Sequence, residues 1–179
     1  MRNGLPAAGL SELAHEIQEH TEQGIARYGV AVRWLSGTRA QVQTLPATIG
    51  TQRVQRDFSW LIDEPRQLGG TNHAPNPQEV LLSGLGACLM VGFAVGATVM
   101  GIQLSKLEVE LEATLDLAGF LDVRAGAPVA MSGIRYLIRA AGDGTREQFE
   151  QLRRQAEAHS PNAMSLLKGV PLSGALAGD

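Results

Sequence analysis

The sequence predicts one domain of the α+β class, with antiparallel-rich sheets packed on a single long buried helix. An uncharged run of 23 residues from Val80 to Ile102 is long enough for one continuous helix. Segments in which apolar and polar residues alternate, as in half-buried strands, occur in groups on both sides of that run. Grouped strands favour an α+β fold over a doubly wound parallel sheet. A chain of 179 residues can bury a substantial core.

The N-terminal part begins with a short amphipathic helix predicted over residues 10–23, where leucine and isoleucine recur at helical spacing. We treat residues 1–26 as a helical extension and residues 27–179 as the main domain. Three strands are then predicted, over residues 27–35, 39–46 and 53–62. A glycine-rich loop follows over residues 68–75.

The long helix has a clear start signal. Asn76 is a good N-cap, and Pro77 suits the first helical position because its missing N–H is not needed there. Glu79 can bond back to the backbone of Asn76 and close a capping box. The helix is therefore predicted to begin immediately after Asn76.

The C-terminal half alternates most regularly over residues 107–117, which predicts a strand with one apolar face and one acidic face. A second strand is predicted over residues 132–140. A helix opened by Thr145 and Gln148 follows, and then a short helical turn opened by Ser160 before Pro161. Apolar residues over 170–176 predict a closing strand.

The long uncharged run has two interpretations. Its length also suits a membrane span, but its glycines make it only moderately apolar and its flanks show no cationic asymmetry. No basic segment leads into an apolar one near residue 1, so we expect no signal peptide. We favour a buried helix of a cytoplasmic protein without membrane contact. One subunit has difficulty covering such a helix on all sides, so we expect a homodimer.

Composition limits the possible partners. A net charge of −3 provides no electrostatic basis for binding nucleic acid. The single cysteine excludes an internal disulfide framework and is consistent with a reducing cytoplasm. The four histidines and one cysteine lack the spacing of zinc ligands, and we expect neither a metal nor a cofactor.

The cysteine, Cys88, lies near the centre of the uncharged run. Together with Gly84, Gly92 and Gly96 it forms a stripe of small residues four apart on the predicted helix. A buried cysteine in such a stripe is usually an inert packing residue. The alternative is a reactive thiolate, which needs a nearby cation, and several arginines precede the helix.

The segment from Asp63 to Leu89 resembles the signature of the OsmC-like family, which includes the organic hydroperoxide resistance proteins. The shared pattern is a Gly-Gly pair, an Asn-Pro-x-Glu helix start and small residues leading to Ala87-Cys88. The order of elements from about residue 27 to 177 also agrees. The resemblance implies an intertwined homodimer with two long central helices and a site between subunits.

In active members of that family, the cysteine on the central helix attacks a hydroperoxide and becomes a sulfenic acid. A second cysteine, at a Cys-Pro helix start, then forms a disulfide with it, and dithiol reductants such as lipoyl groups restore the pair. Cys88 matches the first position. Ser160 stands at the second, so the two-thiol cycle cannot run within one chain and this protein resembles a divergent member of the family.

Other site residues implied by the resemblance are only partly present. The family uses an arginine near the first hairpin, for which Arg39 is the best candidate. It also uses a glutamate ten residues before the cysteine, where this chain has Gln78. We interpret the neighbouring Glu79 as the helix cap. The candidates to line the site are Gln78, Glu79, Ser160 and, in the glycine-rich loop, His73.

Two functions are therefore expected. The first is peroxiredoxin-like, thiol-dependent reduction of small apolar organic hydroperoxides in oxidative-stress defence, with an external thiol as reductant. The alternative is a non-catalytic dimer whose former site binds a small apolar ligand.

Overall fold

The computed structural model describes residues 1–178 and confirms the α+β class. The chain divides into two compact units, which are described separately. The N-terminal unit is Pro6–Leu81. The core unit consists of Met1–Leu5 together with the chain from Leu82 onward. The predicted boundary at residue 26 stays a prediction.

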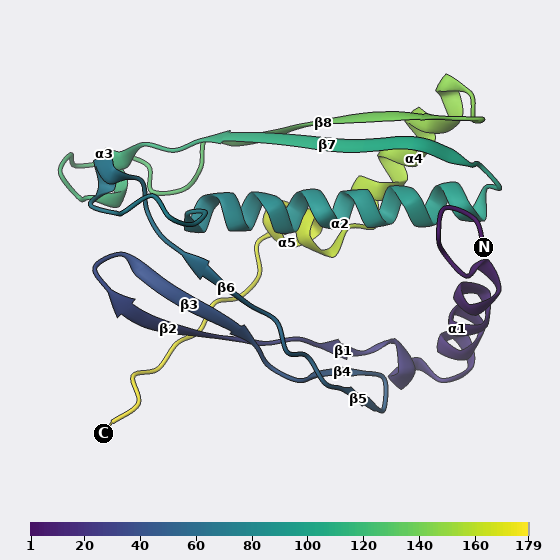
Figure 1. Cartoon of the computed structure of the whole chain (residues 1–179), viewed down its shortest axis with the longest axis horizontal. Coiled ribbons are helices and arrows are strands. Elements are labelled where there is room, and N and C mark those ends of the chain that lie inside the picture. The colour runs from purple at the N-terminus through teal and green to yellow at the C-terminus, as the bar shows by residue number, and fades with distance from the viewer. Residues whose placement is uncertain (179) are drawn as a thin grey trace. The chain divides into compact units, whose positions relative to one another are not determined.

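The N-terminal unit contains two small antiparallel sheets, with strand orders β1-β4-β5 and β2-β3-β6 (Figure 1). Its elements are α1 (Ala7–Glu19), η1 (Thr21–Gly24), β1 (Ala26–Arg27), β2 (Val30–Ser36), β3 (Arg39–Thr44), β4 (Ala47–Ile49), β5 (Gln52–Val54), β6 (Ser59–Ile62) and η2 (Arg66–Leu68). The pairing of Val32 with Val42, and of Val42 with Trp60, places apolar side chains on one face of the β2-β3-β6 sheet.

The strand predicted over 27–35 is divided between β1 and β2, which belong to different sheets, and two further predicted strands also differ from the structure. The strand predicted over 39–46 ends at Thr44, and the one predicted over 53–62 becomes β5 and β6, which belong to different sheets. Gly50, with a φ of 56°, makes the tight turn between β4 and β5. At the start of β6 the Thr44 hydroxyl accepts the Phe58 N–H at 3.0 Å in place of a ladder bond. Local alternation alone could not reveal these exchanges between sheets.

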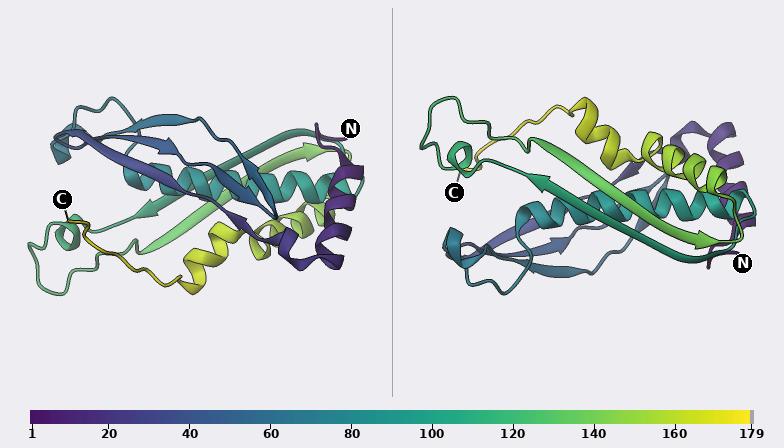
Figure 2. Two further views of the ribbon diagram at one scale, coloured as in Figure 1. Left: turned by 90° about the horizontal axis from the view of Figure 1, so that it is seen from below. Right: turned by 90° about the horizontal axis from the view of Figure 1, so that it is seen from above.

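The core unit is built around α2 (Pro77–Val99), which begins in the N-terminal unit and continues into the core unit. An antiparallel hairpin and two further helices lie along it (Figure 2). These elements are β7 (Leu104–Thr114), α3 (Leu117–Phe120), β8 (Gly133–Gly142), α4 (Arg146–Ala158) and α5 (Pro161–Lys168).

Two apolar clusters hold the core unit together. The first is centred on Phe93, Ala97 and Leu152, which join α2 to α4. The second joins α2 to α5 and the hairpin through Leu85, Leu89 and Ala163. As predicted, the apolar residues of β7 face these clusters and its glutamates are exposed. The glutamates form surface ion pairs such as Glu112 with Arg135 at 2.9 Å.

The predicted starts of α2 and α4 are confirmed, whereas the first helix begins at Ala7 and ends at Glu19 instead of spanning 10–23. The Asn76 N–H donates to Glu79 Oε2 and the Glu79 N–H donates to Asn76 Oδ1, both at 2.8 Å. Thr145 and Gln148 form a second capping box at the start of α4. These reciprocal bonds satisfy N–H groups that a helix start leaves unpaired.

The predicted closing strand over 170–176 is wrong, because residues 169–178 contain no helix or strand. Pro171 has no N–H to donate to a ladder, and Leu172 and Leu176 are 98% and 99% exposed. The strand predicted to reach residue 117 also ends earlier, at Thr114, because the Asp116 carboxylate accepts the Ala118 N–H and caps α3.

Among residues 1–178, α2 has the length and mean hydropathy, 2.1, that a membrane span requires. Within its apolar window 28% of the residues are buried in the structure. The core helix of a soluble domain meets the same criteria, so this finding is weak evidence for a membrane. The packing of α2 in both apolar clusters agrees with the predicted core helix.

Candidate functional site

Cys88 is half-buried on α2, and its glycine neighbours show which way it faces. A Cβ atom placed on Gly84 would lie 3.6 Å from Asn162 Nδ2, in α5. Placed on Gly92 it would lie 3.4 Å from Ala156 Cα, in α4. The small-residue stripe therefore faces α4 and α5. Cys88 lies between these two glycines, about 6 Å from each along the helix.

The residues that join α4 to α5, His159 and Ser160, form what we call the corner. In the sequence they lie between Ala156, which contacts Gly92, and Asn162, which contacts Gly84. Because Cys88 lies between the same two glycines on α2, the corner passes α2 at the level of Cys88. Ser160 is 2% exposed, and its Oγ accepts the Ala163 N–H at 3.1 Å, as a helix cap. The predicted site residues Cys88 and Ser160 thus belong to the same side of the core unit.

The corner is tied to α2 by a polar contact as well as by packing. The Asn162 side-chain amide donates to the Gly84 carbonyl oxygen at 2.8 Å. That carbonyl lies one helical turn before Cys88. The absence of a side chain at Gly92 lets α4 approach α2 to van der Waals distance. These contacts hold the corner against the helix on both sides of Cys88.

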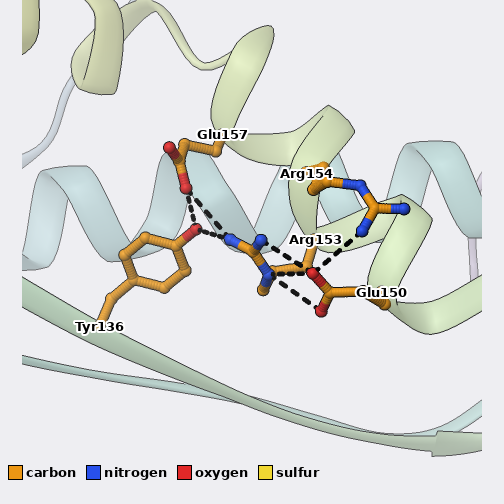
Figure 3. A network of polar contacts seen from close by, with 5 residues as sticks. All are labelled: Tyr136, Glu150, Arg153, Arg154 and Glu157. Atoms are coloured by element: carbon orange, nitrogen blue, oxygen red, sulfur yellow. Dashed lines mark hydrogen bonds and ion pairs between the residues drawn. The ribbon is translucent and has the colours of Figure 1, made fainter. Parts of the chain in front are cut away.

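A polar network lies at the C-terminal half of α4 (Figure 3). Arg153 donates to Glu150 Oε1 at 2.9 Å, to Glu157 Oε2 at 3.2 Å and to the Tyr136 oxygen at 2.7 Å. The Tyr136 hydroxyl itself donates to Glu157 Oε2. Burial and then the bond to Glu157 raise the pKa of Tyr136, whereas Arg153 lowers the pKa of Glu150. The phenol therefore stays protonated and remains a donor.

Arg39 is the first residue of β3 in the N-terminal unit and is exposed. Its Nη2 atom donates to the Ser36 hydroxyl oxygen at 2.8 Å. Among the described residues no carboxylate forms an ion pair with it, so no side chain of opposite charge compensates the guanidinium. Arg33 on β2 is similar, because its Nη2 donates to the neutral Gln41 side chain at 2.6 Å.

The sequence analysis missed an organising residue of the N-terminal unit, Asp63, which follows β6 and is 1% exposed. Its carboxylate accepts hydrogen bonds from the Thr38 hydroxyl and, across the glycine-rich loop, from the Thr71 hydroxyl and N–H and the His73 N–H. It also accepts the Glu64 N–H at 2.9 Å. These bonds hold the pKa of Asp63 far below its ordinary value, and the bond from the Thr71 hydroxyl has the largest effect. Burial of the carboxylate acts in the opposite direction and raises the pKa.

Asp63 thereby joins the β2–β3 turn to the glycine-rich loop. The loop is also tight at Gly70, where a Cβ atom would lie 1.7 Å from the Glu64 carbonyl oxygen. An acid directly after an apolar strand, followed by Gly-Gly-Thr, was the signal available in the sequence. That signal is weak, because an aspartate two residues before a proline is also an ordinary loop residue.

The remaining predicted site residues lie in the same unit. His73 is exposed, and its Nδ1 lies 2.9 Å from the Thr71 carbonyl oxygen. Glu79 caps α2 as predicted, and Gln78 is half-buried. Burial raises the pKa of Glu64, whose Oε2 atom is buried and has no hydrogen-bond partner among residues 1–178. Within the same residues, no group of three His, Cys, Asp or Glu side chains could hold a metal ion.

Comparison with known proteins gives one consistent result. The sequence profile described as OsmC-like protein matches residues 70–173, which include the start of α2, Cys88 and the corner. No curated protein is similar enough in sequence to be matched.

Solved structures show the same fold. An OsmC-like protein of Mycoplasma pneumoniae has a TM-score of 0.61 at 16% identity, over 80% of this chain and 89% of that one. An organic hydroperoxide resistance protein of Legionella pneumophila has a TM-score of 0.50 at 22% identity, over 79% and 90%. The organic hydroperoxide resistance protein OhrB of Bacillus subtilis has a TM-score of 0.51 at 16% identity, over 80% of this chain and 92% of that one. Because the profile covers more than half of the chain, the protein belongs to the OsmC-like family.

Proposed function

We propose that this protein reduces small organic hydroperoxides through Cys88, with an external thiol as the reductant. The observation that carries the proposal is the position of the chain's single cysteine, on the face of α2 that the α4–α5 corner passes. Family membership supports it, since similar folds occur in proteins named for organic hydroperoxide resistance.

The proposed cycle needs only one protein thiol. The Cys88 thiolate attacks the terminal oxygen of the hydroperoxide, the O–O bond breaks, and an alcohol leaves after taking up a proton. Cys88 is then a sulfenic acid. An external thiol attacks its sulfur and expels water, which leaves a mixed disulfide. A second external thiol releases Cys88 as a thiol and itself becomes part of a free disulfide.

Ser160 explains why the reductant must come from outside. Its hydroxyl cannot form a disulfide, and its hydrogen bond to the Ala163 N–H gives it a structural role as the cap of α5. The corner therefore keeps the family's helix start without its second thiol.

Arg39 is proposed as the cation that favours the thiolate. Its hydrogen bond to Ser36 is exposed and neutral, so breaking it costs at most about 1.5 kcal/mol. The charge is therefore available at little cost. Arg33, on the same hairpin and with a similarly neutral partner, is the matched control.

We also propose that the protein acts as a cytoplasmic homodimer. Large apolar side chains remain exposed on β2 and on α2, among them Val32 at 62%, Trp34 at 72% and Val91 at 62%. Exposed apolar surface of this extent is typical of protein interfaces. A second copy of the chain would cover it.

The test is to mix reduced protein with cumene hydroperoxide and follow Cys88 by mass spectrometry and by a sulfenic-acid probe. The expected result is one added oxygen on Cys88, formed much faster than on free cysteine. Arg39→Gln should slow this step by about tenfold, as expected for loss of one favourable charge. Arg33→Gln should leave it unchanged.

A second variant tests the role of position 160. Ser160→Cys should convert the sulfenic acid into an internal disulfide, with loss of water and without external thiol. If Cys88 in the natural chain reacts no faster than free cysteine, the redox proposal is wrong. The non-catalytic dimer that binds an apolar ligand would then be the remaining function, and Cys88→Ser should leave its ligand binding unchanged.

A further inference from the structure

The polar network on α4 has a single member that comes from another element. Arg153, Glu150, Arg154 and Glu157 all belong to α4, so their ion pairs strengthen that helix alone. Tyr136 comes from β8 and is the residue through which the network reaches the hairpin (Figure 3). Its hydroxyl donates to Glu157 and accepts from Arg153.

Glu157 connects this contact to the corner. Its side chain accepts the Tyr136 hydroxyl, and its backbone carbonyl oxygen accepts the Ser160 N–H at 3.2 Å. A displacement of Glu157 would therefore be passed to Ser160 through one backbone hydrogen bond. On the other side of the corner, Asn162 is held by the Gly84 carbonyl oxygen.

We propose that Tyr136 is a positioning residue, whose bond to Glu157 keeps the α4–α5 corner in place against the Cys88 face of α2. This inference rests on the proposed function in one respect, namely that an attacking thiol must approach Cys88 along the corner. Tyr136 acts through Glu157 and touches neither sulfur nor substrate.

The geometry explains why a phenol suits this role. The Tyr136 ring packs on the second apolar cluster of the core unit, which consists of Leu85, Leu89 and Ala163. Its oxygen meets a carboxylate and a guanidinium that are both partly buried. A rigid ring thus fixes one end of the contact, while two charge-assisted bonds fix the other. Phenylalanine would keep the packing and lose only the bonds.

The experiment uses the full chain with Ser160→Cys as the parent, because disulfide formation between positions 88 and 160 reports how well the corner is placed. Hydroperoxide first forms the sulfenic acid on Cys88, and the introduced thiol then expels water from it. The two rates are measured separately, by sulfenic-acid probe and by mass spectrometry of the intrachain disulfide. Circular dichroism confirms that each variant is folded.

Adding Tyr136→Phe should slow disulfide formation by about two- to tenfold, the effect of losing the bond to Glu157, which is the one that reaches the corner, and leave sulfenic-acid formation unchanged. In the same parent, Glu157→Gln keeps an acceptor for the phenol and should retain most of the rate of disulfide formation. Glu157→Ala removes that acceptor and should slow the reaction as much as Tyr136→Phe does. Glu150→Gln is the matched control, because it removes an ion pair of Arg153 that does not reach the corner. It should leave both rates unchanged.

Equal rates in the parent and the Tyr136→Phe variant would overturn the inference, and so would equal slowing by Glu150→Gln. Diamide separates this failure from a failure of the proposed function. It oxidises two thiols to a disulfide by taking up two electrons and two protons, so it needs no peroxide chemistry. If Cys88 is inert to hydroperoxide, diamide still forms the disulfide, and Tyr136→Phe should still slow it.

Discussion

The core unit and the N-terminal unit bury their apolar residues to different extents. In the core unit Phe93, Leu89 and Leu152 are no more than 1% exposed, and they contact residues of the same unit. In the N-terminal unit Val30, Val32 and Trp34 are 53%, 62% and 72% exposed along one strand. The buried polar residue Asp63 organises that unit instead, through hydrogen bonds to two of its loops.

This difference separates two sources of order. The core unit is stabilised by apolar packing around α2, which is non-directional and additive over many contacts. The loop of the N-terminal unit depends on a few directional bonds to one carboxylate, and the apolar side chains of β2 stay exposed. Substitutions in the two units should therefore fail in different ways.

The largest effect is expected in the core unit. Phe93→Ala removes a ring that is 1% exposed and stacked on Phe149 at 6.2 Å between centroids. The free energy of unfolding should fall by about 3–5 kcal/mol, measured by chemical denaturation. Val123→Ala, between α3 and β8 in the same unit and 73% exposed, is the control and should cost less than about 1 kcal/mol. Equal losses would show that α2 is not packed as described.

An intermediate effect is expected at Asp63, and it depends on pH. Because the folded state lowers its pKa below the ordinary 3.8, the carboxylate stabilises the fold fully above that pH. The contribution is lost as the pH falls below 4 toward the folded-state pKa. Asp63→Asn should therefore lower stability at neutral pH and flatten its decline between pH 4 and 2, as measured by denaturation at each pH. An unchanged acid profile would contradict the assignment.

The smallest effect on folding is expected on the exposed face of β2. Val32→Gln should change the free energy of unfolding of one subunit by about 0.5 kcal/mol or less, because Val32 is 62% exposed. If that face pairs with a second copy, the same variant should sediment as a monomer at micromolar concentration. Ala31→Gln, on the opposite face of the same strand, should leave the assembly unchanged. A wild-type monomer would remove the dimer proposal.

Much of the fold could be predicted because its signals are local. The Asn76–Glu79 cap, the alternation of β7 and the Thr145–Gln148 cap each depend on residues within a few positions of one another. The division of the strand over 53–62 and the absence of a closing strand could not be predicted in this way. They depend on which partner strand is within reach, and alternation carries no information about partners.

The sequence by itself determined the fold class, the start of the long helix, the family resemblance and the presence of one cysteine with serine at the second position. These properties follow from residue identity and short spacing. Only the tertiary structure decided that the small-residue stripe faces the α4–α5 corner, that Tyr136 joins that corner to β8, and that Asp63 joins two loops. Such contacts link residues far apart in the chain, and only packing in three dimensions selects them from the many that the composition allows.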